Sequence, residues 1–284
     1  MEPPFIADDF DKLDHKVLIL SKNIQPGVDL VQIQGDTAFY IHKYMTPYSN
    51  PTSFSTEVNN HVKIGDSPYV PRLVAIITKN NENRGLLLTA IDGDDLSKLT
   101  LTLSDKWNVT DNLLHALLHL ESRSYFPQDL KPANIIRRRA DMSVAIIDLG
   151  DGHTEGYYRD RSSSSHVQGR EIPPAGVFQG SDSFYTLGRT LWAIWSDDPL
   201  CFNHPEPPGT MPQLIRHIIH DCCNTGRFTT IGQLYSEVSG KIKNEVNSAE
   251  GLAISQSGMT TSSLHSSLTF SLGKTSVLKG GLCP

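Results

Sequence analysis

The sequence has few cysteines, no large excess of charge and no long apolar run. Its formal net charge of −6 gives no general attraction to nucleic acid or to an acidic membrane. The apolar run at 17–20 is too short to cross a bilayer, and no early stretch has the basic start and apolar run of a signal peptide. The cysteines fit neither a zinc pattern nor a disulfide framework, since they are irregularly spaced: Cys201, Cys222, Cys223 and Cys283. We therefore expect a soluble protein of the cytosol or nucleus, with no nucleic acid or membrane partner.

The composition is that of an ordinary globular chain. Of its 284 residues, 38% are hydrophobic and 20% are charged. That length suits one larger domain or two small lobes, and either arrangement has enough chain to bury a core. The sequence carries no information about the oligomeric state.

The first third of the chain is typical of a small sheet with one helix. Residues 1–15 are polar and predict an irregular lead-in. A helix is expected at 51–64, with Thr52 or Ser53 as its N-cap. Apolar runs, two of them alternating with polar residues, predict strands at 16–21, 28–34, 37–45, 71–79 and 84–91.

After residue 91 the pattern changes to helices. The helix expected at 104–124, with Ser104 as its cap, has one apolar stripe, formed by Val109, Leu113, Ala116, Leu117 and Leu120. Further helices are predicted at 182–195, 211–223 and 229–242. The change predicts an α+β fold with a β-rich lobe at 16–91 and a helical lobe at 92–243. Residues 244–284 are rich in Ser and Thr and predict a disordered tail.

A cluster of polar residues lies beside two apolar runs. Asp129, Lys131 and Asn134 lie within six positions in "FPQDLKPANII", and Pro132 keeps that segment from forming a regular helix. Asp148 ends the apolar run of "VAIIDLG". Two carboxylates, an amide and an ammonium suit a divalent cation and a polyphosphate, because Mg²⁺ prefers oxygen ligands and phosphoryl transfer needs mainly positioning and charge neutralisation. The alternative is a chance group of solvated residues in a loop.

These motifs resemble those of eukaryotic protein kinases. "DLKPANII" is similar to the catalytic loop and "IIDLG" to the metal-binding D-F-G motif, in the same order. The resemblance implies that Asp129 accepts the proton of the substrate hydroxyl, that Lys131 steadies the transferred phosphoryl group, and that Asn134 and Asp148 hold Mg²⁺. The lysine of "DLKP" is the form found in Ser/Thr kinases.

The resemblance extends over roughly residues 16–240. It implies that Lys43 pairs with the phosphates of ATP and with Glu57 of the first helix, that Leu88 lines the adenine pocket, and that the backbone from Thr89 to Ile91 meets the base edge. "DSFYTLGRTLWAI" resembles the central helix of the large lobe, and Arg227 stands at a characteristic arginine. For Lys43 and Glu57 a position on a solvated surface is the alternative.

The sequence departs from the kinase pattern at three places. Ser21, Asn23 and Pro26 replace the glycines of the phosphate-binding loop, where backbone N–H groups approach phosphate closely. Pro127 and Gln128 replace the His-Arg pair before the catalytic Asp, which removes the usual partner of a phosphorylated activation loop. No A-P-E motif is present, and the usual Asp of the central helix falls on Ser183.

The sequence thus predicts an ATP- and Mg²⁺-dependent Ser/Thr protein kinase that acts on a protein substrate. A pseudokinase or binding module with the same fold is the second hypothesis, because the glycine loop is missing. A small-molecule phosphotransferase is a third.

Overall fold

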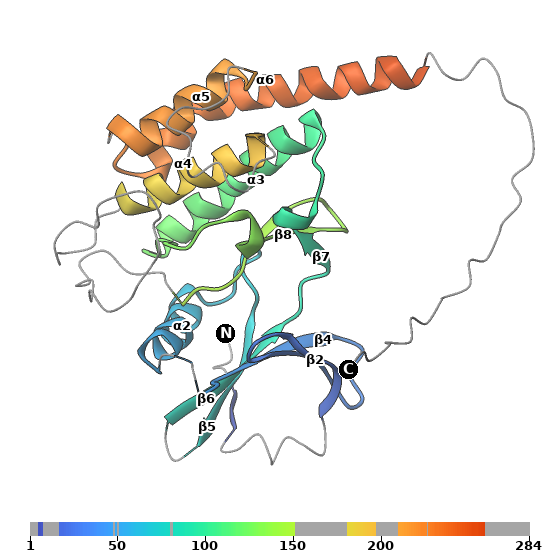
Figure 1. Cartoon of the computed structure of the whole chain (residues 1–284), viewed down its shortest axis with the longest axis vertical. Helices are drawn as coiled ribbons and strands as arrows, with labels where there is room; N and C mark the ends of the chain where they lie inside the picture. Colours follow the sequence, from blue (N-terminus) through green and yellow to red (C-terminus); the bar gives the residue numbers. More distant parts are fainter. Residues whose placement is uncertain are drawn as a thin grey trace, which may run out of the picture.

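The computed structural model describes residues 5–7, 17–47, 49, 51–79, 82–150, 181–196, 210–225 and 227–258. These residues form two lobes, a small lobe built on a sheet and a larger lobe built mainly of helices (Figure 1). The α+β class and the two-lobed arrangement predicted from the sequence are confirmed. Residues 151–180 lie outside the described part of the chain.

The small lobe contains a six-stranded sheet with the order β1-β5-β6-β4-β3-β2. Every neighbouring pair is antiparallel except β1 and β5, which run parallel. The strands are β1 Phe5–Ala7, β2 Val17–Gln25, β3 Val28–Ile33, β4 Phe39–Tyr44, β5 Leu73–Lys79 and β6 Glu82–Thr89. The prediction of an irregular lead-in is wrong for residues 5–7, because their backbone pairs with Ala75–Ile77 at the edge of the sheet.

Helix α2, Pro51–Ile64, covers one face of this sheet. Phe54 and Val58 of the helix pack against Leu86 and Leu88 of β6. The helix begins at Pro51, so the prediction of Thr52 or Ser53 as N-cap is wrong and both residues lie in the first turn. Proline suits the first helical position because its missing N–H would have no helical acceptor there.

A second, three-stranded sheet joins the lobes. Its order is β7-β8-β9, with β7 Gly93–Asp95, β8 Ile135–Arg138 and β9 Val144–Ile146. A short 3-10 turn, η1 Leu96–Lys98, leads to α3, Leu103–Ser122. Thr102 caps α3 in a capping box with Asp105, rather than Ser104 as predicted. The predicted apolar stripe of α3 is buried as expected.

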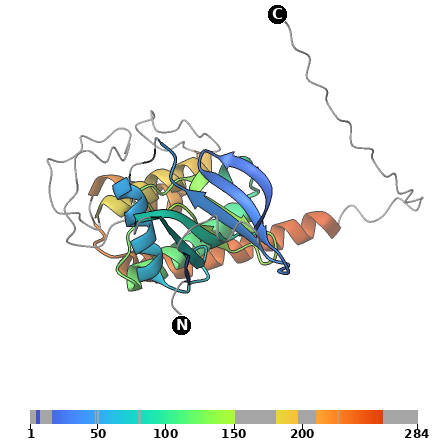
Figure 2. The ribbon, with the colours of Figure 1, turned by 90° about the horizontal axis from the view of Figure 1, so that it is seen from below.

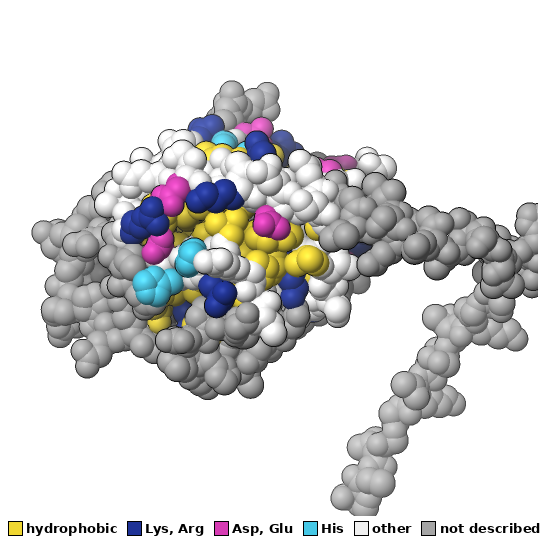
Figure 3. Space-filling view, turned by 90° about the horizontal axis from the view of Figure 1, so that it is seen from above, with side chains coloured by type: hydrophobic (Ala, Val, Ile, Leu, Met, Phe, Trp, Pro, Cys, Tyr) yellow, Lys and Arg dark blue, Asp and Glu magenta, His cyan; other side chains and the backbone are white. Residues whose placement is uncertain are grey.

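Four helices enclose the main core of the large lobe. They are α3, α4 Ser181–Ser196, α5 Gln213–His220 and α6 Ile231–Gly258, and a π-helical turn, η4 Asp221–Thr225, follows α5. Seen from below, the sheet lies in front of these helices and α6 extends past it (Figure 2). Seen from the side of α5 and α6, apolar side chains are bordered by charged and histidine side chains (Figure 3).

Helix α6 is longer than the sequence indicated. Residues 244–258, which were predicted to belong to a disordered tail, are helical, and residues 259–284 lie outside the described part. Ile242, Val246 and Ala249 follow helical spacing and pack on the main core, which explains the extension. None of the helices in the described ranges has the length and apolar character needed to span a membrane.

Candidate active site

A cavity of about 330 Å³ lies between the two lobes. The small lobe contributes side chains from β2, β3, β4, β6 and α2, and the large lobe contributes the segment after β9 and the turn η2, Pro132–Asn134. Seven of the residues predicted for the site line this cavity, together with the backbone neighbour Ala90: Lys43, Glu57, Leu88, Thr89, Ile91, Asn134 and Asp148. Residues from distant parts of the chain therefore meet here.

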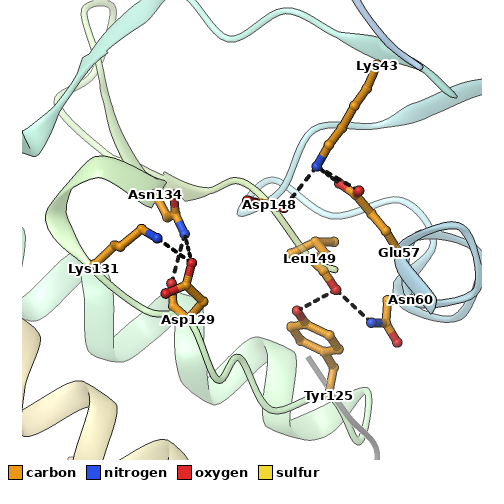
Figure 4. Close-up of polar contacts among 9 residues, drawn as sticks. All are labelled: Lys43, Glu57, Asn60, Tyr125, Asp129, Lys131, Asn134, Asp148 and Leu149. Atoms are coloured by element: carbon orange, nitrogen blue, oxygen red, sulfur yellow. Dashed lines mark hydrogen bonds and ion pairs between the residues drawn. The ribbon is translucent and has the colours of Figure 1, made fainter. Parts of the chain in front are cut away.

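Lys43 lies between two carboxylates (Figure 4). Its Nζ is 2.7 Å from Glu57 Oε2 on α2 and 2.9 Å from Asp148 Oδ1, which comes from the large lobe. Burial by itself lowers the pKa of Lys43, but Glu57 and Asp148 more than offset this and raise the pKa above its ordinary value. Lys43 is therefore a fixed cation that joins the two lobes at the cavity wall.

Asp148 combines an unusual backbone with a perturbed carboxyl group. Its φ of 62° is in the left-handed region, which is uncommon for any residue but glycine. Burial tends to raise the pKa of Asp148, while the charge and hydrogen bond of Lys43 lower it, and the net result is a pKa below the ordinary value. The carboxylate is thus kept ionised, as a cation ligand must be.

The segment from Asp129 to Asn134 forms a compact hydrogen-bonded loop. Asn134 Nδ2 donates to the carbonyl of Asp129 at 2.8 Å and to Asp129 Oδ2 at 2.9 Å. Lys131 Nζ forms an ion pair with the same Oδ2. From α4, the hydroxyl of Thr190 donates to the carbonyl of Leu130 at 2.7 Å. Three predicted residues therefore contact one another in this loop (Figure 4), but only Asn134 lines the cavity, and Asp129 and Lys131 do not.

The backbone of residues 89–91 is partly engaged within the protein. The N–H of Thr89 donates to the carbonyl of Arg72, and the N–H of Ala90 donates to the carbonyl of Phe39, both at 3.0 Å. The backbone groups of this segment that could still contact a base edge are therefore its carbonyls and the N–H of Ile91. Leu88 is buried and lines the cavity.

The hairpin of β2 and β3 replaces a glycine-rich loop. The two strands are joined by the turn Pro26-Gly27, and register shifts interrupt the pairing of β2 between Ile19 and Gln25. Ile24 and Gln25 line the cavity. Sequence reasoning missed these two residues.

Arg227, predicted from the resemblance, forms ion pairs within the large lobe. Its guanidinium is 2.7 Å from Asp221 of η4 and 2.7 Å from Glu237 of α6. The arginine ties together the end of α5, the turn after it and α6.

The comparisons with known proteins agree with this architecture. The arrangement of a strand-rich lobe with one helix, a helical lobe and a cavity between them is a protein-kinase-like fold. Among solved structures, the chain is similar to the kinase PK-1 of Cydia pomonella granulovirus, with a TM-score of 0.63 and 17% sequence identity. The match covers 80% of this chain and 95% of that one. No protein-family model matches the sequence.

Proposed function

We propose that this protein transfers the terminal phosphoryl group of ATP to serine or threonine hydroxyls of a protein substrate. The observation that carries the proposal is Lys43, which bonds Glu57 and Asp148 at the wall of a cavity that Asn134 also lines. A fixed cation beside two potential metal ligands suits a bound polyphosphate. The preference for serine and threonine rests on the lysine of "DLKP".

The donor set suits Mg²⁺. Asp148 offers a carboxylate and Asn134 an amide oxygen, since the amide nitrogen of Asn134 is used for Asp129. Both residues line the same cavity, and oxygen donors of this kind are the protein ligands that Mg²⁺ takes alongside phosphate oxygens. When bound, the metal would neutralise charge on the phosphates.

The remaining roles fall to the catalytic loop. Asn134 and Lys131 both bond Asp129 Oδ2, which fixes the orientation of that carboxylate. Asp129 would accept a hydrogen bond from the substrate hydroxyl and take its proton, while Lys131 would stabilise the negative charge of the transferred group. Lys43 would hold the phosphates, and Glu57 keeps Lys43 in place.

A nucleotide-binding module without useful turnover is the second candidate, and the β2–β3 hairpin favours it. Pro26 has no N–H to offer a phosphate, and Ile24 presents an apolar side chain to the cavity. These residues replace the backbone contacts that a glycine-rich loop would provide. The two candidates share the nucleotide site and differ in catalysis.

Two measurements test the proposal. The first is a thermal shift with ATP and Mg²⁺, or with Mn²⁺ in its place, and the absence of any shift would contradict nucleotide binding. The second is phosphate transfer to a generic protein substrate. We expect Asp129→Asn to lose at least a hundredfold in rate and Asp148→Ala to lose all metal-dependent turnover. An Asp129→Asn protein as active as the wild type would show that a contaminant carries the activity, whereas binding without transfer in the wild type would favour the module.

A further inference from the structure

The backbone carbonyl of Leu149, next to Asp148, is held by two side chains from different parts of the fold. Asn60 Nδ2, from α2, donates to it at 2.7 Å, and the hydroxyl of Tyr125, which follows α3, donates to it at 3.3 Å (Figure 4). Asn60 is 5% exposed and Tyr125 is 1% exposed, so neither bond is accessible to bulk water. We name this arrangement of Asn60, Tyr125 and the Leu149 carbonyl the carbonyl clamp.

The clamp adjoins a strained backbone position of the site. Asp148 has a φ of 62°, and a non-glycine residue keeps such a conformation only where the surrounding structure enforces it. Lys43 holds the carboxylate of Asp148 on one side of this position. The clamp holds the next carbonyl on the other side, and the fully buried side chain of Leu149 anchors the segment to the main core.

Helix α2 carries both halves of this arrangement. Glu57 and Asn60 are three residues apart on α2 and lie on one face, so the helix reaches Lys43 through one side chain and Leu149 through the other. A third link comes from Lys63, whose Nζ donates to the carbonyl of Ser124 beside Tyr125. The position of α2 and the orientation of Asp148 are therefore linked through side chains on one face of this helix.

Packing alone does not explain the residue types in the clamp. A buried amide, hydroxyl or carbonyl costs free energy unless it is hydrogen-bonded, and an apolar residue at either position would take a donor away from the buried Leu149 carbonyl. Here both polar groups converge on one carbonyl oxygen. This carbonyl oxygen belongs to Leu149, the residue directly after the proposed metal ligand Asp148. The two polar side chains therefore act next to the proposed metal site.

We propose that Asn60 and Tyr125 are positioning residues that hold the Leu149 carbonyl so that the carboxylate of Asp148 points into the cavity. The assignment rests on the proposed function for the identity of the ligand, but the clamp itself is a property of the protein alone. Its loss frees residues 147–150 to leave the strained conformation and turns the carboxylate away from the metal position.

The test uses Tyr125→Phe, which removes only a hydroxyl, and Asn60→Leu, which removes the amide and keeps a similar volume. Thr110→Val is the control, because Thr110 is also fully buried and its hydroxyl bonds inside the large lobe, where it donates to the Lys106 carbonyl and accepts from Trp195 Nε1. Thr110 does not line the cavity. The first readout is hydrogen–deuterium exchange of the unliganded full chain over peptides that contain 147–150. The second is the affinity for ATP with and without Mg²⁺.

We expect faster exchange over 147–150 in both clamp variants and no change there in Thr110→Val. We also expect the gain in ATP affinity on adding Mg²⁺ to fall at least fivefold, while the affinity without Mg²⁺ stays within twofold of the wild type. Unchanged exchange over 147–150 would overturn the clamp. Faster exchange with an unchanged Mg²⁺ effect would overturn its role in positioning Asp148. A wild type that binds no ATP would contradict the proposed function, and exchange would still decide whether the clamp holds the segment.

Discussion

At the scale of single residues, Glu57 requires a cation. Its side chain is 4% exposed, and a carboxylate taken out of water is costly unless a charge and hydrogen bonds compensate. Lys43 provides that charge through two contacts, to Oε1 at 2.8 Å and to Oε2 at 2.7 Å. The pair thus serves stability as well as the proposed chemistry, and the two roles can be separated in the absence of any ligand.

We predict that Lys43→Met lowers the free energy of unfolding by about 2 kcal/mol, somewhat less than for a fully buried pair because Lys43 is partly exposed. The double variant with Glu57→Gln should regain part of that loss, since the buried carboxylate of Glu57 is then replaced by a neutral amide. Urea denaturation measures both. Lys98→Met is the control, because Lys98 is exposed and its pairing with Asp95 is screened by solvent, so its loss should be smaller than that of Lys43→Met. Equal losses in the two single variants would contradict the argument.

The buried His61 gives the site a dependence on pH. Burial, with a contribution from Lys43, lowers the pKa of His61 from 6.5 to about 4. Between these values the unfolded chain binds a proton that the folded protein does not, so stability falls as the pH drops from 6.5 to 4 and is unaffected by this group above that range. Protonation would also place a second positive charge near Lys43.

We therefore predict that His61→Leu weakens the pH dependence of unfolding. Between pH 7 and pH 4 the wild type should lose up to about 3 kcal/mol more than this variant. Urea denaturation at several pH values measures the difference. His220→Gln, at an exposed position, is the control and should follow the wild type. A variant whose stability falls with pH as steeply as that of the wild type would rule out His61 as the source.

At the scale of elements, the β2–β3 hairpin depends on Gly27. Its φ is 76°, and a Cβ there would lie 2.7 Å from the carbonyl oxygen of Tyr44. The N–H of Tyr44 donates to the carbonyl of Gly27 at 2.8 Å, so the turn lies directly on the end of β4. Any side chain at this position must push the hairpin away from the strand that carries Lys43.

We predict that Gly27→Ala costs more than Gly35→Ala, although both residues have positive φ. Gly35 has φ of 85° and nothing within 4 Å of an added Cβ, so its substitution carries only the left-handed penalty of about 1 kcal/mol. Gly27→Ala adds the clash with Tyr44, a further 1 to 3 kcal/mol, roughly. Urea denaturation compares the two, and ATP binding should weaken only for Gly27→Ala. Equal costs would show that the hairpin moves without strain.

The elements also show which parts of the structure could be predicted from the sequence. The alternation in β4 and the fixed spacing from Asp129 to Asp148 are local, so the strand and the motif could be predicted. The three-residue strand β1 could not, because its partner β5 is some seventy positions away. The carbonyl clamp was missed for the same reason, since Asn60 and Leu149 are joined only by the fold.

At the scale of the whole molecule, the two lobes differ in the size of their buried apolar cores. The largest cluster of buried residues belongs mainly to the helical lobe. The sheet of the small lobe has two clusters on its described residues, one around Val31 and Leu87 and one around Phe54 and Leu86, and each is far smaller. Because stability follows buried apolar area, the small lobe is expected to be the weaker unit.

We predict that the small lobe unfolds at a lower urea concentration than the helical lobe, and that bound nucleotide brings the two unfolding midpoints closer together. All three tryptophans, Trp107, Trp192 and Trp195, lie in α3 and α4, so their fluorescence reports the helical lobe alone. Hydrogen exchange over β3 to β6 should show opening at lower urea than the fluorescence midpoint.

ATP with Mg²⁺ at a hundred times Kd adds about 2.7 kcal/mol to the free energy of unfolding of whichever unit must be folded to bind it. Since Lys43 and Asp148 come from different lobes, we expect this added stability to appear mainly as a higher free energy of unfolding of the small lobe. In the Lys43→Met variant most of the added stability should be lost. Coincident transitions without nucleotide would instead show that contacts across the lobes, the pair of Lys43 with Asp148 among them, already make the protein one cooperative unit.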